Sequence, residues 1–288
     1  MSSRSAELLP TIQNMSAKET TGYVHGFTAE EQDRLYRQAR FTEHRVHDRL
    51  PFWRSRSLLE VGCGVGAQTE ILLRHFPELH ITGVDASEAN LSIARDRLSK
   101  VPWAPGRYEL QHGDAGRLSA ATDTYDSAFL CWVLEHVADP ALVLSEVRRV
   151  LRAGSPVVCT EVQNATFFLQ PYSPQTLAYF AAFNDQQLEL GGDPFVGAKL
   201  GNLLQRVGFT DIRTEVKTIH LDNRAPGERA EFLEYWSELL LSGAGGLLEA
   251  ERVSEEIVEG MERELQIVAH DPDAVFFYAF VQARARVS

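Results

Sequence analysis

A glycine-rich segment near position 60 is the part of the sequence whose residue types and spacing most clearly suggest ligand binding. It reads Leu58-Leu-Glu-Val-Gly62-Cys-Gly64-Val-Gly66 and lies between a predicted strand and a predicted helix. Glycine lets a ligand approach the backbone closely, and the first turn of a helix offers N–H groups that have no partner within the helix. The segment therefore predicts a ligand-binding loop, although a pattern of this kind occurs in several enzyme classes.

Three acidic residues near the ends of neighbouring predicted strands narrow the choice of ligand. Asp85 follows the glycines by about 20 residues, where a carboxylate can accept hydrogen bonds from both hydroxyls of a ribose. Glu60 lies just before Gly62, so it would repel a pyrophosphate and attract a cationic group. Asp114 follows the third strand and can accept a hydrogen bond from the exocyclic amine of adenine. An adenosyl group that carries a sulfonium and an α-amino group matches all three carboxylates.

Two other function classes stay open at this point. A nicotinamide-dependent oxidoreductase would share the sheet and Asp85, but it leaves Glu60 and Asp114 without a role. A non-catalytic subunit that binds S-adenosylmethionine would keep every motif and lack only turnover. The ligand that co-purifies with the protein distinguishes a dinucleotide from S-adenosylmethionine or its homocysteine product.

The order of these motifs resembles that of class I S-adenosylmethionine-dependent methyltransferases. The resemblance covers about residues 55–161 and rests on Glu60–Gly66, Asp85, Asp114-Ala115 and Tyr125–Val137. It implies S-adenosyl-L-methionine as the cofactor, with Gly62, Gly64 and Gly66 around the methionine moiety. It also implies a cofactor contact for five further residues: Asp85 at the ribose, Ala86 beside the adenine, Asp114 and Ala115 at the edge of the adenine, and Trp132 beside the cofactor.

The N-terminal segment resembles that of a narrower group of small-molecule methyltransferases. The residues that carry this resemblance are Tyr23-Val-His25-Gly26-Phe27 and, further along, Gln38. In that group the segment forms a cap over the cofactor, so Tyr23 and Gln38 are expected to contact it. Simple packing of a tyrosine-rich helix entry is the competing interpretation. The stretch Gly191–Gly197 resembles the same group, whereas Arg152–Ser155 departs from the Pro-Gly-Gly that is usual in the family.

Three residues are candidates for the general base that methyl transfer to a hydroxyl or an amine requires. His136 follows the fourth predicted strand, and Tyr23 and His25 would reach the site if the cap closes over it. A histidine that only caps the loop is the competing interpretation of His136. Some quinone-type methyltransferases place a metal at Glu-x-x-Glu-His. The chain has Trp132-Val-Leu-Glu135-His136 there, so the first ligand is missing and no metal is expected.

The acceptor is expected to be small, apolar or aromatic, and similar to a natural product. Nine aromatic residues gather in two predicted insertions, where some can line an apolar pocket: Phe167, Phe168, Tyr172, Tyr179, Phe180, Phe183, Phe232, Tyr235 and Trp236. The nucleophile can be oxygen, nitrogen or carbon. A subgroup that the chain resembles methylates an alkene carbon of prenylated indoles in teleocidin-type biosynthesis. Aromatic rings would stabilise the carbocation that follows. A role in secondary metabolism is the corresponding expectation.

Strands and helices that alternate along the chain must position these residues. Strands are expected at 57–61, 80–84, 107–112, 125–131, 156–161, 212–220 and 274–283, with helices between them. A capping box at Thr28–Glu31 predicts an N-terminal helix that continues to about Leu50, where Pro51 stops it. The fold class is therefore α/β, with a doubly wound, seven-stranded, mostly parallel, Rossmann-like sheet. Residues 1–50 form an arm and helical cap, and residues 51–288 form a methyltransferase domain. Two mostly helical lid insertions are expected in it, at 162–197 after the fifth strand and at 225–269 after the sixth.

Composition excludes several other classes of partner. The chain has 28 Lys+Arg against 40 Asp+Glu, a net charge of −12, so it lacks the basic surface that nucleic acids or anionic membranes need. Three widely spaced cysteines fit neither a disulfide framework nor a metal site, and no secretory signal is visible. We expect a cytoplasmic protein that acts on a small molecule. Exchange of the N-terminal helix between protomers would make it a homo-oligomer.

Overall fold

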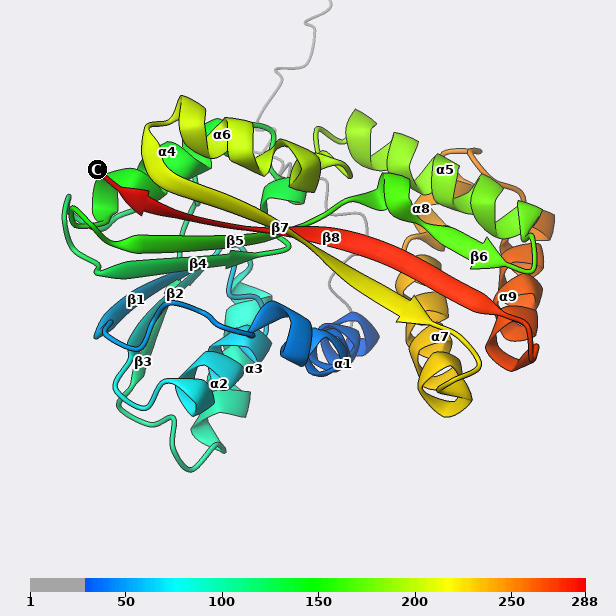
Figure 1. The fold of residues 1–288 in the computed structure, drawn as a ribbon, viewed down its shortest axis with the longest axis horizontal. Helices are drawn as coiled ribbons and strands as arrows, with labels where there is room; N and C mark the ends of the chain where they lie inside the picture. Colours follow the sequence, from blue (N-terminus) through cyan, green and yellow to red (C-terminus); the bar gives the residue numbers. More distant parts are fainter. Residues whose placement is uncertain (1–28) are drawn as a thin grey trace, which may run out of the picture.

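The computed structural model describes residues 29–288, with side chains from Arg34 onward. Within this range the chain forms an eight-stranded mixed sheet with helices packed on both faces (Figure 1). The strand order is β3-β2-β1-β4-β5-β8-β6, and β7 pairs with the other edge of β8. The expected doubly wound α/β architecture is confirmed, with one more strand than predicted.

The half of the sheet that carries the glycine loop is parallel. Its strands are β1 (Ser57–Val61), β2 (His80–Asp85), β3 (Tyr108–His112), β4 (Ser127–Cys131) and β5 (Pro156–Val162). Helices α2 (Ala67–His75) and α3 (Glu88–Ser99) cover one face, and α4 (Pro140–Val150) and α6 (Leu200–Arg206) cover the other (Figure 1). Because the strands are parallel, their carboxyl ends meet at one edge of the sheet, where ligands bind in folds of this type.

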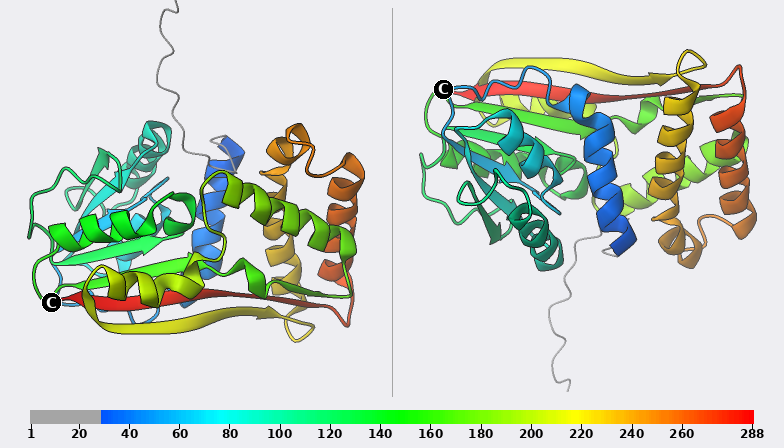
Figure 2. Two further views of the ribbon diagram at one scale, coloured as in Figure 1. Left: turned by 90° about the horizontal axis from the view of Figure 1, so that it is seen from above. Right: turned by 90° about the horizontal axis from the view of Figure 1, so that it is seen from below.

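The last two strands extend the sheet beyond this parallel half. Strands β7 (Phe209–Leu221) and β8 (Val275–Val287) are antiparallel and have 13 residues each. Along its other edge, β8 pairs first with β6 (Phe168–Gln170) and then with β5. Helices α5 (Pro174–Glu189), α7 (Pro226–Leu241), α8 (Ala244–Glu249) and α9 (Glu255–His270) gather around this extension (Figures 1 and 2). We call these helices together with β6 the helical lobe.

Helix α1 (Ala29–Val46) lies between the parallel half and the helical lobe (Figure 2). The hydroxyl of Tyr36 donates a hydrogen bond to Glu70 of α2 at 2.9 Å, and Arg37 forms an ion pair with Glu238 of α7. The prediction that α1 continues to Leu50 was wrong by about one turn. The helix ends at Val46, and Arg49, in the segment between it and Pro51, adopts a left-handed conformation with φ at 53°.

The strands of the parallel half depart from prediction by at most about two residues at an end, and the larger differences lie in the antiparallel part of the sheet. The region 162–197 was expected to be mostly helical, but it contains strand β6 and the short turns η2 (Asn164–Thr166) and η3 (Val196–Lys199) besides α5. Helices α7, α8 and α9 form within 225–269, where a helical block was expected. Strand β7 is longer than predicted because most of it is exposed and polar, and β8 extends beyond its predicted end to Val287.

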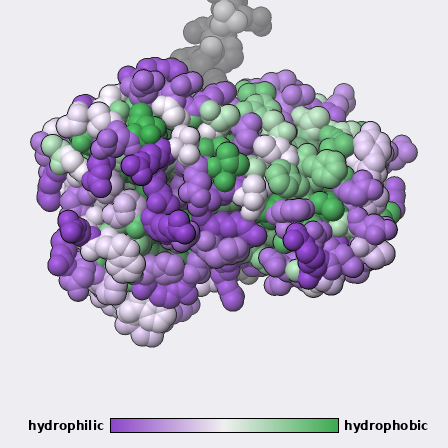
Figure 3. Space-filling view, viewed as in Figure 1, coloured by the Kyte–Doolittle hydropathy of each residue, from purple (hydrophilic) through white to green (hydrophobic). Residues whose placement is uncertain are grey.

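Two apolar cores lie on the two faces of the sheet. One extends from α2 through β1 and β8 into the helical lobe, and the other packs α4 and α6 against the parallel strands. On the face drawn in Figure 3, apolar residues gather over the half that contains the helical lobe, and the parallel half is more hydrophilic. Among residues 29–288, no helix is both long and apolar enough to cross a lipid bilayer.

The junction of α1 with the sheet provides a test of this architecture. The buried Gln282 of β8 donates hydrogen bonds to the carbonyl of Val46 at 2.8 Å and to Thr160 of β5 at 3.1 Å. Replacing Gln282→Leu leaves both acceptors without their donor, and we expect a loss of about 2 kcal/mol in the free energy of unfolding. Chemical denaturation measures the loss. The control Thr214→Ala, exposed on β7, should change stability by less than about 0.5 kcal/mol.

Candidate cofactor and acceptor site

The glycine loop connects β1 to α2 in a conformation that glycine favours. Gly62, Gly64 and Gly66 have φ values of 69°, 51° and 77°, in the left-handed region. A Cβ at Gly62 would lie 2.4 Å from Val133, and one at Gly66 would lie 3.1 Å from Ala94. A Cβ at Gly64 would meet no atom within 4 Å. Packing therefore explains Gly62 and Gly66, whereas Gly64 borders open space in which a ligand can approach the backbone.

Asp85 at the end of β2 is fixed by the backbone on both sides. Its Oδ2 accepts a hydrogen bond from Gly64 N at 2.8 Å, and its Oδ1 accepts one from Ser87 N at 2.8 Å. Burial raises the pKa of Asp85 above its usual value, although these two backbone hydrogen bonds oppose the rise. A carboxylate has about four lone-pair sites, so two remain for the two hydroxyls of a ribose.

Glu60 lies beneath the loop and not on its surface. It is 2% exposed, and its Oε2 accepts a hydrogen bond from the Thr69 hydroxyl of α2 at 2.6 Å. Burial and, to a smaller extent, the nearby charge of Asp85 together raise the pKa of this carboxyl to about 8, although the Thr69 hydrogen bond opposes the rise. A cation bound at the loop would favour the ionised form of Glu60, since opposite charges in a buried site attract strongly.

The predicted adenine contacts follow β2 and β3. Asp114 is exposed, and its Oδ1 accepts a hydrogen bond from Gly116 N at 2.8 Å, which holds the carboxylate at the start of the loop. Ala115 is half-buried beside it, and Ala86 is exposed. The carbonyl of Ala86 lies 3.0 Å from His112 Nε2, which ties the two strand ends together. The structure thus places these residues at the same edge as Asp85.

The residues after β4 form the short turn η1 (Leu134–His136), which contains the candidate base. Trp132 has φ at 58°, an unusual value for a bulky residue, and its ring packs 5.2 Å from that of Phe280. Its buried Nε1 has no hydrogen-bond partner among the residues that the structure describes. His136 is half-buried, and its Nε2 lies 3.7 Å from Oε1 of Glu135. Backbone strain of this kind concentrates at functional sites.

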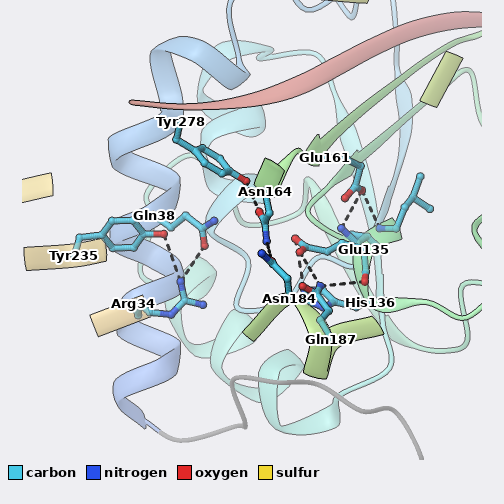
Figure 4. Close-up of polar contacts among 12 residues, drawn as sticks. Arg34, Gln38, Glu135, His136, Glu161, Asn164, Asn184, Gln187, Tyr235 and Tyr278 are labelled. Carbon is cyan, nitrogen blue, oxygen red and sulfur yellow. Dashed lines mark hydrogen bonds and ion pairs between the residues drawn. The ribbon is translucent and has the colours of Figure 1, made fainter. Parts of the chain in front are cut away.

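The remaining predicted residues come from the N-terminal region. Gln38 of α1 is half-buried and accepts a hydrogen bond from Arg34 at 3.3 Å, close to Tyr235 of α7 (Figure 4). It therefore lies between α1 and the helical lobe. Tyr23 and His25 lie outside the described residues.

A set of buried polar residues that the sequence did not reveal surrounds η1. Oε1 of Glu161, at the end of β5, accepts hydrogen bonds from Val133 N at 3.1 Å and Leu134 N at 2.8 Å. Burial and, to a smaller extent, the neighbouring Glu135 together raise the pKa of Glu161 to about 8. The other members are Gln187 and Asn184 of α5, Asn164 of η2 and Tyr278 of β8 (Figure 4). An acid that ends an apolar strand, as Glu161 does, was the one available signal.

The aromatic residues of the two insertions pack mainly on one another. Phe167, Phe180 and Trp236 are in ring contact, and Trp236 also contacts Phe276 and Tyr278 of β8. Phe168 and Tyr172 are instead exposed, by 52% and 75%. Most of the nine rings therefore belong to the core of the helical lobe. That some of them line an acceptor pocket stays a prediction.

Comparison with known proteins distinguishes a methyltransferase from a nicotinamide-dependent oxidoreductase. Residues 59–159, which contain the glycine loop, Asp85, Asp114 and η1, match the protein family described as "Methyltransferase domain". The chain contains a class I S-adenosylmethionine-dependent methyltransferase domain. The cofactor of this methyltransferase domain is thus S-adenosyl-L-methionine, and the alternative of a nicotinamide-dependent oxidoreductase has no support here.

Relatives and solved structures extend this result. Demethylmenaquinone methyltransferase of Staphylococcus aureus strain JH9 is 29% identical over 174 residues, 56% of this chain and 68% of the relative. Phosphoethanolamine N-methyltransferase 2 of Haemonchus contortus, with S-adenosylhomocysteine bound, has a TM-score of 0.51 at 20% identity. The match covers 88% of this chain and 52% of that one, so the chain spans about half the length of that enzyme.

Two further structures share the fold of the methyltransferase domain. The [4+2]-cyclase SpnF has a TM-score of 0.51 at 21% identity, with 89% of this chain and 81% of that chain covered. The YcgJ protein of Bacillus subtilis has a TM-score of 0.54 at 12% identity, with 91% and 100% covered. At these identities the likeness concerns the fold alone. The methyl acceptor has to be inferred from the residues around the site.

The raised pKa of Glu161 predicts how stability depends on pH. In the unfolded chain a glutamate ionises near pH 4.3, whereas the folded protein keeps Glu161 protonated up to about pH 8. Between these values the folded state binds the extra proton, so the stability from this group is present at low pH and is lost as pH rises through about 8. We expect Glu161→Gln to make the fall in stability shallower by up to about 1.4 kcal/mol per pH unit.

Urea denaturation at several pH values from about 5 to 8 measures this slope. Glu161→Gln keeps an oxygen for the two backbone N–H groups, which limits other losses. The exposed Glu109→Gln serves as the control and should leave the slope unchanged. An identical slope in wild type and Glu161→Gln would show that Glu161 is ionised in the folded protein.

Proposed function

We propose that the protein transfers a methyl group from S-adenosyl-L-methionine to a small, apolar acceptor. The observation that carries the proposal is the position of three acids at the edge of the sheet that faces the helical lobe: Glu60 lies beneath the glycine loop, Asp85 accepts a hydrogen bond from Gly64 of that loop, and Asp114 follows the neighbouring strand β3. Three carboxylates on three adjacent strands suit a ligand with an adenine, a ribose and a cationic end.

The residues at this edge fit the cofactor in their chemistry. Asp85 retains two lone-pair sites for the ribose hydroxyls, and Gly64 leaves open space next to the N-terminus of α2. Asp114 and Ala115 would hold the adenine edge, with Ala86 on its face. The buried Glu60 would compensate the positive charge, and Trp132 would lie beside it. Gln38 and Tyr23 would complete the site from the N-terminal side.

The protein's own contribution to the reaction is alignment and removal of a proton. When bound, the cofactor supplies a methyl group: a lone pair of the acceptor forms the new bond to the methyl carbon, and the sulfur keeps the electrons of the broken S–C bond as a neutral thioether. An acceptor hydroxyl or amine must then lose its proton, and we assign His136 of η1 as the base that takes it. Tyr23 and His25 are the alternative bases on the N-terminal side. An acceptor that reacts through an alkene carbon would instead rely on aromatic rings.

The apolar character of the acceptor follows from the surroundings of the site. Trp132 and Phe280 are in ring contact beside η1, and the aromatic core of the helical lobe continues from there. Demethylmenaquinone methyltransferases, named for a quinone-type compound, are among the relatives. A quinol, a phenol or a prenylated indole are therefore the classes of acceptor to test, and O-, N- and C-methylation all remain in scope.

The insertions and the N-terminal region would exclude water from this site. We assign residues 1–50 to an arm and cap, and 162–197 and 225–269 to a lid on the methyltransferase domain of residues 51–288. Helix α1 touches both α2 and α7, which is the position that a cap requires. Assembly into a homo-oligomer by exchange of the arm remains part of this proposal.

The contact between Asp85 and the ribose can be tested with the product S-adenosylhomocysteine. In Asp85→Asn one carboxylate oxygen becomes an NH₂ that cannot accept a hydrogen bond. Calorimetry should show micromolar binding to wild type and at least about a tenfold loss in the variant, which corresponds to about 1.4 kcal/mol. The control Asp96→Asn, which is exposed on α3, should bind as wild type does. Equal affinities in all three proteins would remove Asp85 from the ribose site.

Independence from metal ions is a second prediction for the same assay. Trp132 stands where the Glu-x-x-Glu-His pattern has its first ligand, and the described residues contain no cluster of three metal-ligating side chains. Methyl transfer should therefore continue at an unchanged rate after dialysis against EDTA. Loss of turnover that Mg²⁺ restores would contradict this interpretation of η1.

A further inference from the structure

Strand β7 forms one edge of the sheet, and much of its outer side is uncovered. Among the described strands it pairs with β8 alone, and both views of Figure 2 show it along the outside of the molecule. It has 13 residues, its side chains from Arg213 to Val216 are exposed, and Val216 is exposed by 64%. A long edge strand with unpaired backbone groups is a template for pairing with another chain.

The backbone of β7 directs every second residue away from β8. Ala279 of β8 turns both of its backbone groups to Thr166 of η2: its N donates to Thr166 Oγ1 at 2.8 Å, and its carbonyl accepts from that hydroxyl at 3.0 Å. Thr218 is opposite Ala279 in the sheet, so the two residues form a non-hydrogen-bonded pair and the backbone groups of Thr218 point outward. Arg45 Nε donates to the Thr218 carbonyl at 2.9 Å, which agrees with this direction.

Val216 and Thr214 share this direction, because backbone directions repeat every two residues along a strand. Among the described residues, Arg45 is the one side chain that bonds to the backbone of Arg213–Leu221. The usual protections of an edge strand are weak here, since β7 contains no proline and its register shift lies at its start, between Thr210 and Arg213. The outward groups of Val216 and Thr214 are therefore open to a further strand.

The side chains of β7 are complementary to those of a second copy of the same strand. Glu215 and Lys217 lie on one side of the strand, with Glu215 Oε1 2.8 Å from Lys217 Nζ. In an antiparallel pair with its two-fold axis at Val216, each Glu215 stands opposite Lys217 of the second copy, and the four charges alternate in sign. Thr214 stands opposite Thr218 of the second copy. Opposite charges and paired threonines in these positions stabilise a sheet.

Neighbouring registers lack this complementarity. An axis at Glu215 or at Lys217 places two like charges directly opposite each other, which is destabilising. An axis at Thr218 leaves both charged residues opposite apolar ones. An axis at Thr214 also pairs opposite charges, but it does so across the irregular segment between Thr210 and Arg213, where the regular backbone pattern is interrupted.

We propose that β7 is an interface with a second copy of this chain: the two strands pair antiparallel about Val216 and join two sheets into one. The partner is the same chain because the edge is complementary to itself under a two-fold axis. Asp85 and Asp114 follow β2 and β3, at the opposite end of the strand order, so cofactor binding does not depend on this contact. The inference does not rest on the proposed function.

A disulfide tests the register directly. Opposite residues of a hydrogen-bonded antiparallel pair have Cα atoms about 5.5 Å apart, a separation that a disulfide can bridge. Val216→Cys should therefore give a covalent dimer on mild oxidation, seen on a non-reducing gel. The matched variant Thr214→Cys is exposed on the same strand, but its two thiols would be displaced by about 14 Å along the strands, so it should stay uncrosslinked.

Charge reversal tests the same interface in solution. Glu215→Lys and Lys217→Glu each place like charges opposite each other, so light scattering should show half the wild-type mass and a dissociation constant at least about tenfold higher. Mixed in equal amounts, the two variants again oppose unlike charges and should form a heterodimer. The control Asp96→Lys, exposed on α3, makes the same change in net charge and should assemble as wild type does.

These outcomes separate pairing at β7 from other forms of assembly. Circular dichroism establishes that each variant is folded. Exchange of the N-terminal arm alone would give an assembly whose mass neither reversal changes, and that result would overturn the proposal. A wild type that stays monomeric at every concentration would overturn it too, as would cross-linking of Thr214→Cys to the same extent as Val216→Cys. Failure to bind S-adenosylhomocysteine would instead refute the proposed function alone.

Discussion

Strand β8 is the element on which the arrangement of the molecule depends. Along one edge it pairs first with β6 and then with β5, and along the other it pairs with β7 for nearly its whole length. Because these are backbone hydrogen bonds within a single sheet, the helical lobe cannot move as a unit without breaking strand pairing. The lobe is therefore held at the carboxyl edge of the parallel strands, where the cofactor-binding residues converge.

Three buried glutamates lie near the carboxyl edge of the parallel strands. Glu60, Glu135 and Glu161 are each less than 10% exposed, and the described hydrogen bonds to them come from neutral donors: Thr69, Gln187 and backbone N–H groups. Burial raises the pKa of Glu60 and of Glu161 to about 8, which costs stability whenever they ionise. A site that keeps such groups is suited to a positively charged ligand and to the release of a proton.

The sequence predicts the parallel half of the fold well and the antiparallel half less well. Strand β1 has the predicted bounds, because the apolar residues Leu58, Leu59 and Val61 mark it clearly. Strand β6 has only three residues, and most of β7 is exposed and polar, so neither shows a strong apolar pattern. Helix α1 ends at Val46, before the predicted stop at Pro51, and the left-handed conformation of Arg49 that follows is not indicated by its residue type.

In the site, too, residues in local motifs can be predicted from the sequence, whereas contacts between distant segments cannot. Gly64, Asp85 and Asp114 belong to motifs whose spacing is visible along the chain. Gln187 contacts Glu135 across 52 positions of sequence, and only the packing of α5 against η1 brings them together.

The central claim is that the carboxyl edge of the parallel strands binds S-adenosylmethionine and its product. Native mass spectrometry of the purified protein, incubated with equal concentrations of S-adenosylhomocysteine and NAD, tests it most directly. We predict a one-to-one complex with S-adenosylhomocysteine that Asp85→Asn weakens, and no complex with NAD. A complex with NAD, or no complex with S-adenosylhomocysteine at concentrations well above micromolar, would contradict the claim.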